Sequence, residues 1–337
     1  MSKVRLIDVA EKAGVSKSTA SQFLSGRFEY MSSDTRARIQ QAVEELNYVP
    51  NNIARSLKTD TTRSIGVIVR DIAGFYTSHA IRGMDDFCKS HGYDMIIYNT
   101  DFEPATEARA IKSLGQLRVD GMIIASSGSN TELVSENSGR ETPLVQFQLE
   151  HDDSDKDIIL SDYRQAAFDA TEYLIQLGHK RICFITQEYK SVKSRFERYQ
   201  GYVDALNKYS IPIDEQLIQY WQRETGLRNS PKSILESSNA PTAFFAQHLA
   251  ITVDLLKALD KADISIPDDV SVVGFDEIPM AEFFKVPITV VKQQPYVVGS
   301  EAAKLLINKI QNPEKDSKRI MVPCSLIVRD SCKRLSP

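Results

Sequence analysis

Apolar positions near the start of the chain recur at helical spacing. Residues at i, i+3, i+4 and i+7 lie on one side of a helix, so such a set marks the face that a short helix buries. Two sets have this spacing: Leu6, Val9, Ala10 and Ala13, and then Ile39, Ala42, Val43 and Leu46. The pattern predicts two short amphipathic helices, the second capped by Ser32 or Ser33 and ended by residues 47–50.

A third helix is predicted between these two. Gly14 interrupts the first stripe, as a residue suited to positive φ would, and Ser16 can cap the next helix. Ala20, Phe23 and Leu24 then face inward, and the opposite side carries Lys17, Ser18, Ser21 and Gln22. Two short helices, a tight glycine turn and a polar outer face are typical of a helix-turn-helix, although an ordinary helical hairpin with a solvated face has the same pattern.

Residues 51–57 form a separate short element in which Ile53 and Leu57 share a face and Asn51 or Asn52 can serve as the cap. One or two helical turns are marginal alone, because the cost of nucleation is not recovered. Residues 58–63 read as a polar linker, and the alternative is that all of 50–63 is linker.

From Ser64 onward, short continuous apolar runs alternate with helical patterns. Runs without polar alternation suit strands that are buried on both faces of a parallel sheet. The predicted strands are 65–69, 94–99, 121–126, 143–148, 157–161, 181–186, 243–246, 270–275 and 288–293, and the predicted helices are 80–90, 107–117, 166–177, 196–209, 250–262 and 299–310. We predict an α/β fold with two doubly wound parallel-sheet lobes, and a small ligand in the cleft between them at the carboxyl ends of the strands.

Composition narrows the class of protein. The 337 residues are 42% hydrophobic and 26% charged, with no apolar run long enough to span a membrane and a start too charged for a signal peptide. The cysteines form no CxxC pair, which favours reduced thiols over a zinc site. We therefore expect a cytoplasmic protein that has no metal and no cofactor.

Charge is distributed unevenly along the chain. Residues 1–63 hold 10 Lys and Arg against 7 Asp and Glu, a net +3, whereas the remaining 274 residues hold 31 against 38, a net −7. A basic head on an acidic body fits DNA contact that is confined to the head.

Two other classes of protein are less compatible with the sequence. An enzyme on a doubly wound scaffold is disfavoured because the chain has no GxGxxG after a strand, no GxxxxGK[ST], no GxSxG and no HExxH. A plain sugar receptor is disfavoured by the helical head and the absence of a signal peptide.

Over nearly its full length the chain resembles the LacI/GalR family of bacterial transcription regulators. The motifs that carry the resemblance are LIDVAEKAGVSKSTAS, TRARIQQAVEELNYVPNNIARSL, RSIGVIV, NTD (99–101), VDGMII, LGHKRICFI, IPDDVSVVGFDEIP and PITVVKQ. The resemblance implies a head (1–49), a hinge helix with linker (50–63) and a two-lobed core (64–337) that binds effector and dimerises. It also implies a homodimer on near-palindromic operator DNA.

The resemblance assigns roles in the head. Lys17, Ser18 and Gln22 would meet base edges in the major groove, and Thr19 and Ser21 would contact phosphate. The family usually has Arg at the Gln22 position; Arg pairs with guanine and Gln with adenine, so we expect an altered half-site. The hinge residue Leu57 is implied to act as an apolar wedge in the minor groove, flanked by Asn51 and by Arg55, which is available to phosphate or groove.

In the core the resemblance implies that Arg198 and Asp276 hold a sugar or sugar acid, by a bidentate fork and a carboxylate. Further effector contacts are implied for Asp71, Phe75, Tyr76, Gln148, Gln247, His248 and Gln293. This chain departs from the family at DIAGFY (71–76), at Gln148 where many relatives have Asp, and at Gln247-His248. Structural roles, such as Arg198 in a surface ion pair, Asp276 as a helix cap or Phe75 in the core, are the alternatives.

This chain lacks the Asp that many relatives have at the Gln148 position, and it lacks an Asp at the His248 position as well. Because Arg198 is kept and His248 is added, we expect a more positive pocket, with Lys190, Lys193 and Arg195 near its mouth. We therefore expect a sugar acid in preference to a neutral hexose. The segment FEYMS (28–32) is similar to a KdgR-like subgroup associated with acids such as 2-keto-3-deoxygluconate. The resemblance implies a repressor, with an activator or corepressor-dependent regulator of carbohydrate genes as the alternative, and the place of Trp221 is left open.

Overall fold

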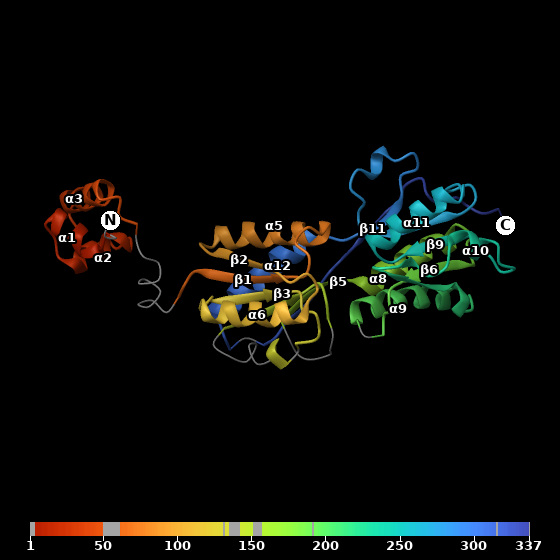
Figure 1. Ribbon diagram of the computed structural model, residues 1–337, viewed down its shortest axis with the longest axis horizontal. Coiled ribbons are helices and arrows are strands. Elements are labelled where there is room, and N and C mark those ends of the chain that lie inside the picture. The colour runs from red at the N-terminus through yellow and green to blue at the C-terminus, as the bar shows by residue number, and fades with distance from the viewer. Residues whose placement is uncertain are drawn as a thin grey trace. The chain divides into compact units, whose positions relative to one another are not determined.

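The computed structural model describes residues 4–49, 61–130, 132–134, 142–150, 157–190, 192–314 and 316–336. The chain forms two compact units, residues 1–62 and residues 63–337. Figure 1 labels the helices and strands of both units.

Residues 4–49 of the first unit form three helices, α1 (Leu6–Ala13), α2 (Lys17–Leu24) and α3 (Ser33–Glu45). Gly14 ends α1 in the left-handed region at φ 63°, as its position in the sequence predicted. The hydroxyl of Ser16 accepts a hydrogen bond from the Thr19 amide at 3.1 Å, and Ser32 accepts from the Thr35 amide at 3.2 Å. Both serines are therefore N-caps, which confirms the helix starts predicted from the sequence.

A small apolar core joins these three helices. Its fully buried members come from α1, α3 and the loop before α3: Val9, Ala13, Met31, Ile39 and Ala42. Polar contacts reinforce the junction of α1 with α3, since Arg38 donates to the Ala13 carbonyl at 3.0 Å and Lys12 pairs with Glu45 at 2.6 Å. The predicted stripes thus face one another, and α2 is left with its polar side outward.

The second unit contains two sheets. The first has the order β12-β5-β4-β3-β1-β2 and is parallel throughout. Its strands are β1 (Ser64–Val69), β2 (Asp94–Asn99), β3 (Gly121–Ile124), β4 (Leu144–Phe147), β5 (Ile158–Ser161) and β12 (Arg319–Val322). Helices α5 (Phe75–Ser90) and α12 (Pro295–Gln311) cover one face, and α6 (Pro104–Gln116) covers the other (Figure 1). We call this sheet and its helices lobe 1.

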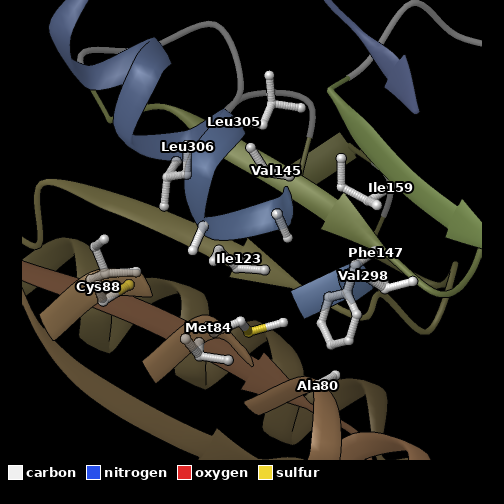
Figure 2. Close-up of a cluster of buried hydrophobic side chains, with 14 of the residues drawn as sticks. Ala80, Met84, Cys88, Ile123, Val145, Phe147, Ile159, Val298, Leu305 and Leu306 are labelled. Atoms are coloured by element: carbon white, nitrogen blue, oxygen red, sulfur yellow. The ribbon is translucent and has the colours of Figure 1, made fainter. Parts of the chain in front are cut away.

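Helices cover both faces of the lobe 1 sheet. Because successive residues of a strand point to opposite faces, consecutive residues of its interior strands are buried. Ile65, Val67 and Val69 of β1 belong to the cluster under α5 and α12, whereas Ile68 belongs to the cluster under α6. Figure 2 shows the larger cluster, in which side chains of α5 and α12 meet those of the strands: Ala80, Met84, Cys88, Val298, Leu305, Leu306, Ile123, Val145, Phe147 and Ile159. This two-sided burial is why the strands read as continuous apolar runs.

The second sheet has the order β13-β11-β10-β9-β6-β7-β8. Its strands are β6 (Ile182–Thr186), β7 (Ile218–Gln222), β8 (Gly226–Leu227), β9 (Ala243–Ala246), β10 (Ser271–Phe275), β11 (Thr289–Lys292) and β13 (Ser325–Ile327). Helices α8 (Tyr163–Gln176) and α9 (Lys193–Lys208) pack on one face, and α10 (Pro231–Leu235) and α11 (Leu249–Lys261) on the other. Two 3₁₀ turns, Glu215–Leu217 and Ala281–Phe283, complete what we call lobe 2.

Among the elements whose bounds are given above, four strands and one helix were not predicted: β7, β8, β12, β13 and α10. Both β8 and β13 pair antiparallel at the edges of the second sheet, so that sheet is parallel only in its interior. These elements are short and partly polar; β12, for example, has exposed residues at two of its four positions. The predicted α/β fold is otherwise confirmed, and each predicted helix of the core is present with an earlier start.

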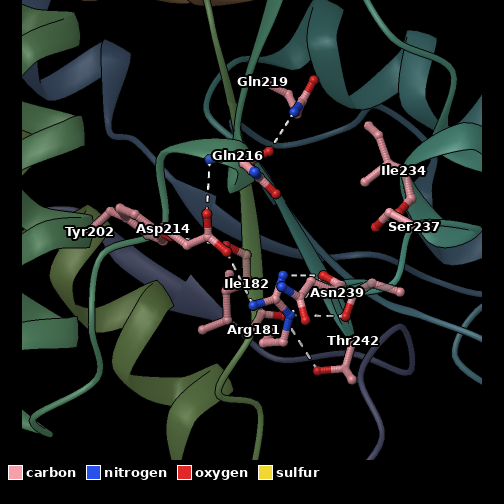
Figure 3. Close-up of polar contacts among 11 residues, drawn as sticks. Arg181, Ile182, Tyr202, Asp214, Gln216, Gln219, Ile234, Ser237, Asn239 and Thr242 are labelled. Atoms are coloured by element: carbon pink, nitrogen blue, oxygen red, sulfur yellow. Dashed lines mark hydrogen bonds and ion pairs between the residues drawn. The ribbon is translucent and has the colours of Figure 1, made fainter.

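In lobe 2, Arg181 makes several contacts at the amino-terminal end of β6 (Figure 3). The guanidinium donates to the carbonyls of Asn239 and Ala240 and forms an ion pair with Asp214 at 3.1 Å. The Arg181 carbonyl in turn accepts from the Thr242 amide at 2.9 Å. These bonds join β6 to the segments that precede β7 and β9, at the end of the sheet opposite the carboxyl ends of its strands.

The chain crosses between the lobes three times: from β5 to α8, from β11 to α12, and from β12 to β13. The crossings are hydrogen-bonded to one another. The Asp162 amide donates to the Val322 carbonyl at 2.8 Å, and the Gln294 side chain donates to the Pro323 carbonyl at 2.8 Å. The Ser161 hydroxyl donates to the Gln293 side-chain oxygen at 2.6 Å.

Cys88, Cys183, Cys324 and Cys332 carry free thiols. Within the described ranges, no group of three or more His, Cys, Asp or Glu side chains could hold a metal ion. In the same ranges, every helix is too short or too polar to cross a bilayer.

Two glycines bring α5 and α12 together, because a Cβ atom on Gly299 would overlap the Ala80 carbonyl and one on Gly83 would overlap the Tyr296 carbonyl. We predict that Gly299→Ala lowers the free energy of unfolding by about 1–3 kcal/mol, the usual range for overpacking. Urea unfolding of the full chain measures it. Gly115→Ala in α6 is the control, since nothing lies within 4 Å of its added Cβ, and it should be neutral or stabilising. Equal destabilisation by both substitutions would contradict this account of the contact.

Candidate functional site

The outer side of α2 is polar and accessible. Lys17, Ser18 and Gln22 are exposed, whereas Thr19 and Ser21 are half-buried. The Ser16 hydroxyl lies 2.8 Å from the hydroxyls of both Ser18 and Thr19, so the start of the helix holds an ordered set of hydroxyl groups. Ala20, on the other side, is completely buried. A cation, an amide and hydroxyls on one exposed helix face can hydrogen-bond to base edges and phosphates.

The three hinge residues singled out from the sequence, Asn51, Arg55 and Leu57, lie outside the residues that the structure describes. Their roles in the minor groove remain predictions.

A cavity of about 900 Å³ is lined by residues of both lobes and lies at the carboxyl ends of their strands. Seven of the nine residues proposed from the sequence for effector contact line it: Asp71, Phe75, Tyr76, Gln148, His248, Asp276 and Gln293. Arg198 and Gln247 are not among its lining residues. Side chains that directly follow β1, β10 and β11 therefore converge on one space, as expected for the switch point of an α/β sheet.

One hydrogen-bonded chain connects the cavity to the crossings between the lobes. Gln293 receives the Ser161 hydroxyl on its side-chain oxygen and donates its side-chain amide to Asp276. The second carboxylate oxygen of Asp276 lies 3.4 Å from the Leu249 amide, at the start of α11. Asp276 thus combines a position at the cavity with a partial helix-capping contact, and its backbone has positive φ (77°).

His248 is the N-cap of α11, and its Nδ1 accepts from the Ala250 amide at 3.2 Å. That hydrogen bond leaves the proton of the neutral ring on Nε2. Burial lowers the pKa of His248 to about 4, with Asp276 opposing the shift and Arg198, Arg195 and Arg223 adding to it. His248 is consequently a neutral donor near pH 7, so the pocket does not take its positive charge from this residue.

Arg198 and Gln247 lie against buried groups instead of the cavity. The Arg198 Cζ stands 4.3 Å from the ring centroids of both Tyr163 and Phe275, and its Nη1 is 3.4 Å from the Gln247 side-chain oxygen. Gln247 donates to the Thr186 hydroxyl. The buried Arg198 Nε has no hydrogen-bond partner among the described residues. This geometry does not support the surface ion pair considered for Arg198.

Several lining residues were not predicted from the sequence. Arg70 follows β1 and directly precedes Asp71, where the motif DIAGFY (71–76) begins. Trp221 lies on β7 and Arg223 follows that strand, which was not predicted. Arg195, expected near the mouth, does line the cavity, whereas Lys190 and Lys193 do not. Trp221 is 4% exposed and donates its indole N–H to Asp254 at 2.7 Å, so its ring is fixed at the wall.

Three arginines line the cavity, and two of them lie over the same aromatic ring. The Cζ atoms of Arg70 and Arg223 lie 5.2 Å and 4.5 Å from the ring centroid of Phe102, which is also at the cavity. Burial, together with repulsion by Arg195 and Arg223, lowers the pKa of Arg70 to about 10, and burial with repulsion by Arg198 does the same to Arg195. Among the described residues no carboxylate forms an ion pair with Arg70, Arg195 or Arg223.

The carboxylates of the cavity, by contrast, have donors. Glu277 pairs with Arg329 at 2.8 Å, Asp254 accepts from Trp221, and the Asp71 side chain accepts from the Ala73 amide at 3.1 Å. The lining therefore holds charges of both signs, and among the described residues Arg70, Arg195 and Arg223 are its cations that form no ion pair.

A helix-turn-helix head attached to a two-lobed core with a cavity between parallel sheets defines a class: DNA-binding regulators with a small-molecule-binding core. Residues 5–51 match the bacterial regulatory proteins of the lacI family, and residues 171–332 match the periplasmic binding protein-like domain. The chain belongs to the LacI family.

Individual relatives agree. The chain is 35% identical to the probable HTH-type transcriptional regulator EndR of Paenibacillus polymyxa over 93% of its length and 92% of that protein. It is 30% identical to the HTH-type transcriptional repressor PurR of Vibrio vulnificus, with 98% of each chain covered. The solved structure of a LacI family transcriptional regulator from Enterococcus faecium with bound ribose has a TM-score of 0.69 and 29% identity, over 81% of this chain and all of that one. The protein is thus a DNA-binding transcriptional regulator and not an enzyme.

The environment of His248 predicts a pH effect. Because the native state holds this ring neutral down to about pH 4 while an unfolded chain protonates it near 6.5, protons favour unfolding between those values. The free energy of unfolding should fall as pH drops through this window, at up to about 1.4 kcal/mol per pH unit from this one group. We expect His248→Asn, which preserves a capping oxygen, to flatten the slope of unfolding free energy against pH.

Burial also lowers the pKa of His179, and that residue affects both proteins alike. The difference between the slopes of wild type and variant therefore isolates His248. Identical slopes would show that the ring is not held neutral.

Proposed function

We propose that this regulator is a repressor, acting in the cytoplasm as a homodimer on a near-palindromic operator, and that a sugar acid bound in the core cavity controls its hold on DNA. A 2-keto-3-deoxygluconate-like acid is the effector we propose. The repressor PurR among the relatives supports the direction of control, and the ribose complex of the E. faecium regulator supports a saccharide in a core of this fold.

The observation that supports an acidic effector is the set of three cavity arginines that form no ion pair among the described residues. Arg70, Arg195 and Arg223 have no described acidic partner, while Asp276, Gln293 and His248 offer acceptors and donors suited to hydroxyl groups. A ligand with hydroxyls and a carboxylate satisfies both sets, because charge-assisted hydrogen bonds to arginine are roughly twice as strong as neutral ones. A neutral hexose would leave the arginines without counter-charge.

Control of DNA binding requires that the effector prefer one arrangement of the lobes, since only differential affinity shifts an equilibrium. Residues from both lobes line the cavity, so closing the lobes on a ligand adds contacts that an open cleft lacks. In our proposal closure shifts the dimer and releases the hinge segments 50–63 from the operator. Asn51, Arg55 and Leu57 would lose their minor-groove contacts in that step, with Leu57 as the wedge.

Effector binding can be followed at Trp221, the single tryptophan of the chain, which lies at the cavity wall. We expect 2-keto-3-deoxygluconate or galacturonate to change its fluorescence and to raise the melting temperature of the full chain, with glucose and galactose doing neither. The same acid should release the protein from operator DNA. Residues 64–337 alone should keep the ligand response and lose DNA binding. If neutral sugars act and acids do not, the proposed effector class is wrong.

The head generates a prediction about base preference. We propose that Gln22 reads adenine and that Gln22→Arg shifts the preferred base at the facing position to guanine, with about 1–3 kcal/mol of discrimination. Selection of binding sites from random DNA by the two proteins measures the shift. Gln40→Arg on the exposed side of α3 adds the same charge elsewhere in the head, so it should strengthen binding to all sequences without changing the preferred base. An unchanged site after Gln22→Arg would remove Gln22 from the reading face.

A further inference from the structure

We propose that Lys193 of lobe 2 and Glu150 of lobe 1 form a detachable clasp that holds the two lobes together at the edge of the cavity. Lys193 thereby sets the fraction of molecules in which the cavity is open. It is a positioning residue, because it acts through the spacing of the lobes and does not line the cavity itself. The clasp does not depend on which effector the cavity takes.

The clasp lies away from the three crossings of the chain. Glu150 comes shortly after β4 in lobe 1, and Lys193 is the first residue of α9 in lobe 2. Gln148, just before Glu150, and Arg195, just after Lys193, both line the cavity. The contact therefore joins the two walls at the edge of the cavity, and separating the lobes there has to break it.

Two interactions make up the clasp. The Lys193 amide donates to the Glu150 carbonyl at 3.2 Å, and the Lys193 Nζ lies 3.5 Å from the Glu150 Oε1. The residue before α9 is Val192, whose side chain has no oxygen to cap the helix. Because the first amides of a helix have no partner within it, a backbone carbonyl of lobe 1 here caps a helix of lobe 2.

Arg319 makes the clasp reversible. It lies on β12 in the same lobe as Glu150 and binds both oxygens of that carboxylate, with Nη2 at 2.6 Å from Oε2. The Glu150 side chain is only 5% exposed, and a buried carboxylate without a cation would be strongly unfavourable. Because Arg319 stays with Glu150 when the lobes separate, Lys193 can leave without stranding that charge. The Lys193 side chain is 26% exposed, so water can take over its ammonium group.

The clasp is weak enough to open and close. An ion pair with a partly exposed lysine shifts an equilibrium by about two- to fivefold. The lobes also meet where Arg223 of lobe 2 lies over the ring of Phe102 of lobe 1, at 4.5 Å from the centroid. Loss of the Lys193 charge should therefore raise the open fraction without releasing the lobes from each other.

Quenching of Trp221 by acrylamide measures the opening of the cavity in the full chain, with no sugar added. Trp221 is the single tryptophan, lines the cavity and is 4% exposed, so a neutral quencher reaches it more readily when the lobes part. We expect Lys193→Gln to raise the Stern–Volmer constant about twofold. Raising NaCl from about 0.05 M to about 0.5 M should raise the wild-type constant and leave that of the variant unchanged, because salt screens the pair that the variant lacks.

Lys190→Gln is the matched control. It removes the same charge from a nearby exposed side chain that does not line the cavity, so quenching should stay at the wild-type value. Lys193→Arg keeps the charge and should keep the wild-type constant and its salt response. In a Glu150→Gln background, Lys193→Gln should change nothing further, because its partner in the ion pair is already neutral.

Equal quenching in Lys193→Gln and Lys190→Gln, or the same salt response in the wild type and Lys193→Gln, would overturn the clasp. So would additive effects of Lys193→Gln and Glu150→Gln, since the lysine would then act without the carboxylate. Because no effector is present, these outcomes leave the proposed sugar acid unaffected, and failure of every acid to bind would leave the clasp unaffected.

Discussion

The core depends on the hydrogen bonds that tie its crossing strands to its cavity. Gln293 sits on the crossing from β11 to α12 and is held by Ser161, which ends β5 on a second crossing. The same side chain donates to Asp276 at the cavity wall. A ligand that changes the hydrogen-bond partners of Asp276 would therefore also affect Gln293 and Ser161, which lie on the segments that connect the two lobes. Since interior packing tolerates few intermediate positions, such a site is suited to two discrete arrangements.

Two sets of polar residues line the cavity, and they suit different groups of a ligand. Carboxylates and amides that already have partners line the part near the crossings, and their spare lone pairs and protons suit hydroxyl groups. Arg70 and Arg223 lie over Phe102 and form no ion pair among the described residues. Repulsion by Arg195 and Arg223 helps to lower the pKa of Arg70, so an anionic group of a ligand beside Arg70 would be favourable. The ligand and the geometry of the lobes are consequently coupled through charge as well as through contact.

Much of the fold was predictable because its strands are buried on both faces and read as uninterrupted apolar runs, as β1 and β10 do. The exceptions arise from exposure. The strand Ile218–Gln222 mixes polar and aromatic residues near a sheet edge, with only two of its positions buried, and Arg319–Val322 has only one buried position. In the head, caps and a glycine turn indicated the helix boundaries, because these are local interactions that the sequence contains in full.

The cavity was predictable in part. Residues directly after predicted strands, such as Asp71 and Asp276, could be placed at the switch point, but Arg223 comes after a strand that went unrecognised. Whether Arg198 faces the cavity or the rings behind it depends on packing between distant segments, which no local pattern encodes. The neutrality of His248 likewise arises from burial and from three arginines that are distant from it in sequence.

The glycine contact between α5 and α12 has a mechanical consequence. The first turns of both helices carry cavity residues, Phe75 and Tyr76 on one and Tyr296 and Val297 on the other, and α12 starts directly at a crossing. Because backbone meets backbone at Gly83 and Gly299, no side chain separates the two helices at these two points. We expect α5 and α12 to move as one body, so that a displacement of the cavity wall is carried to the far end of α5.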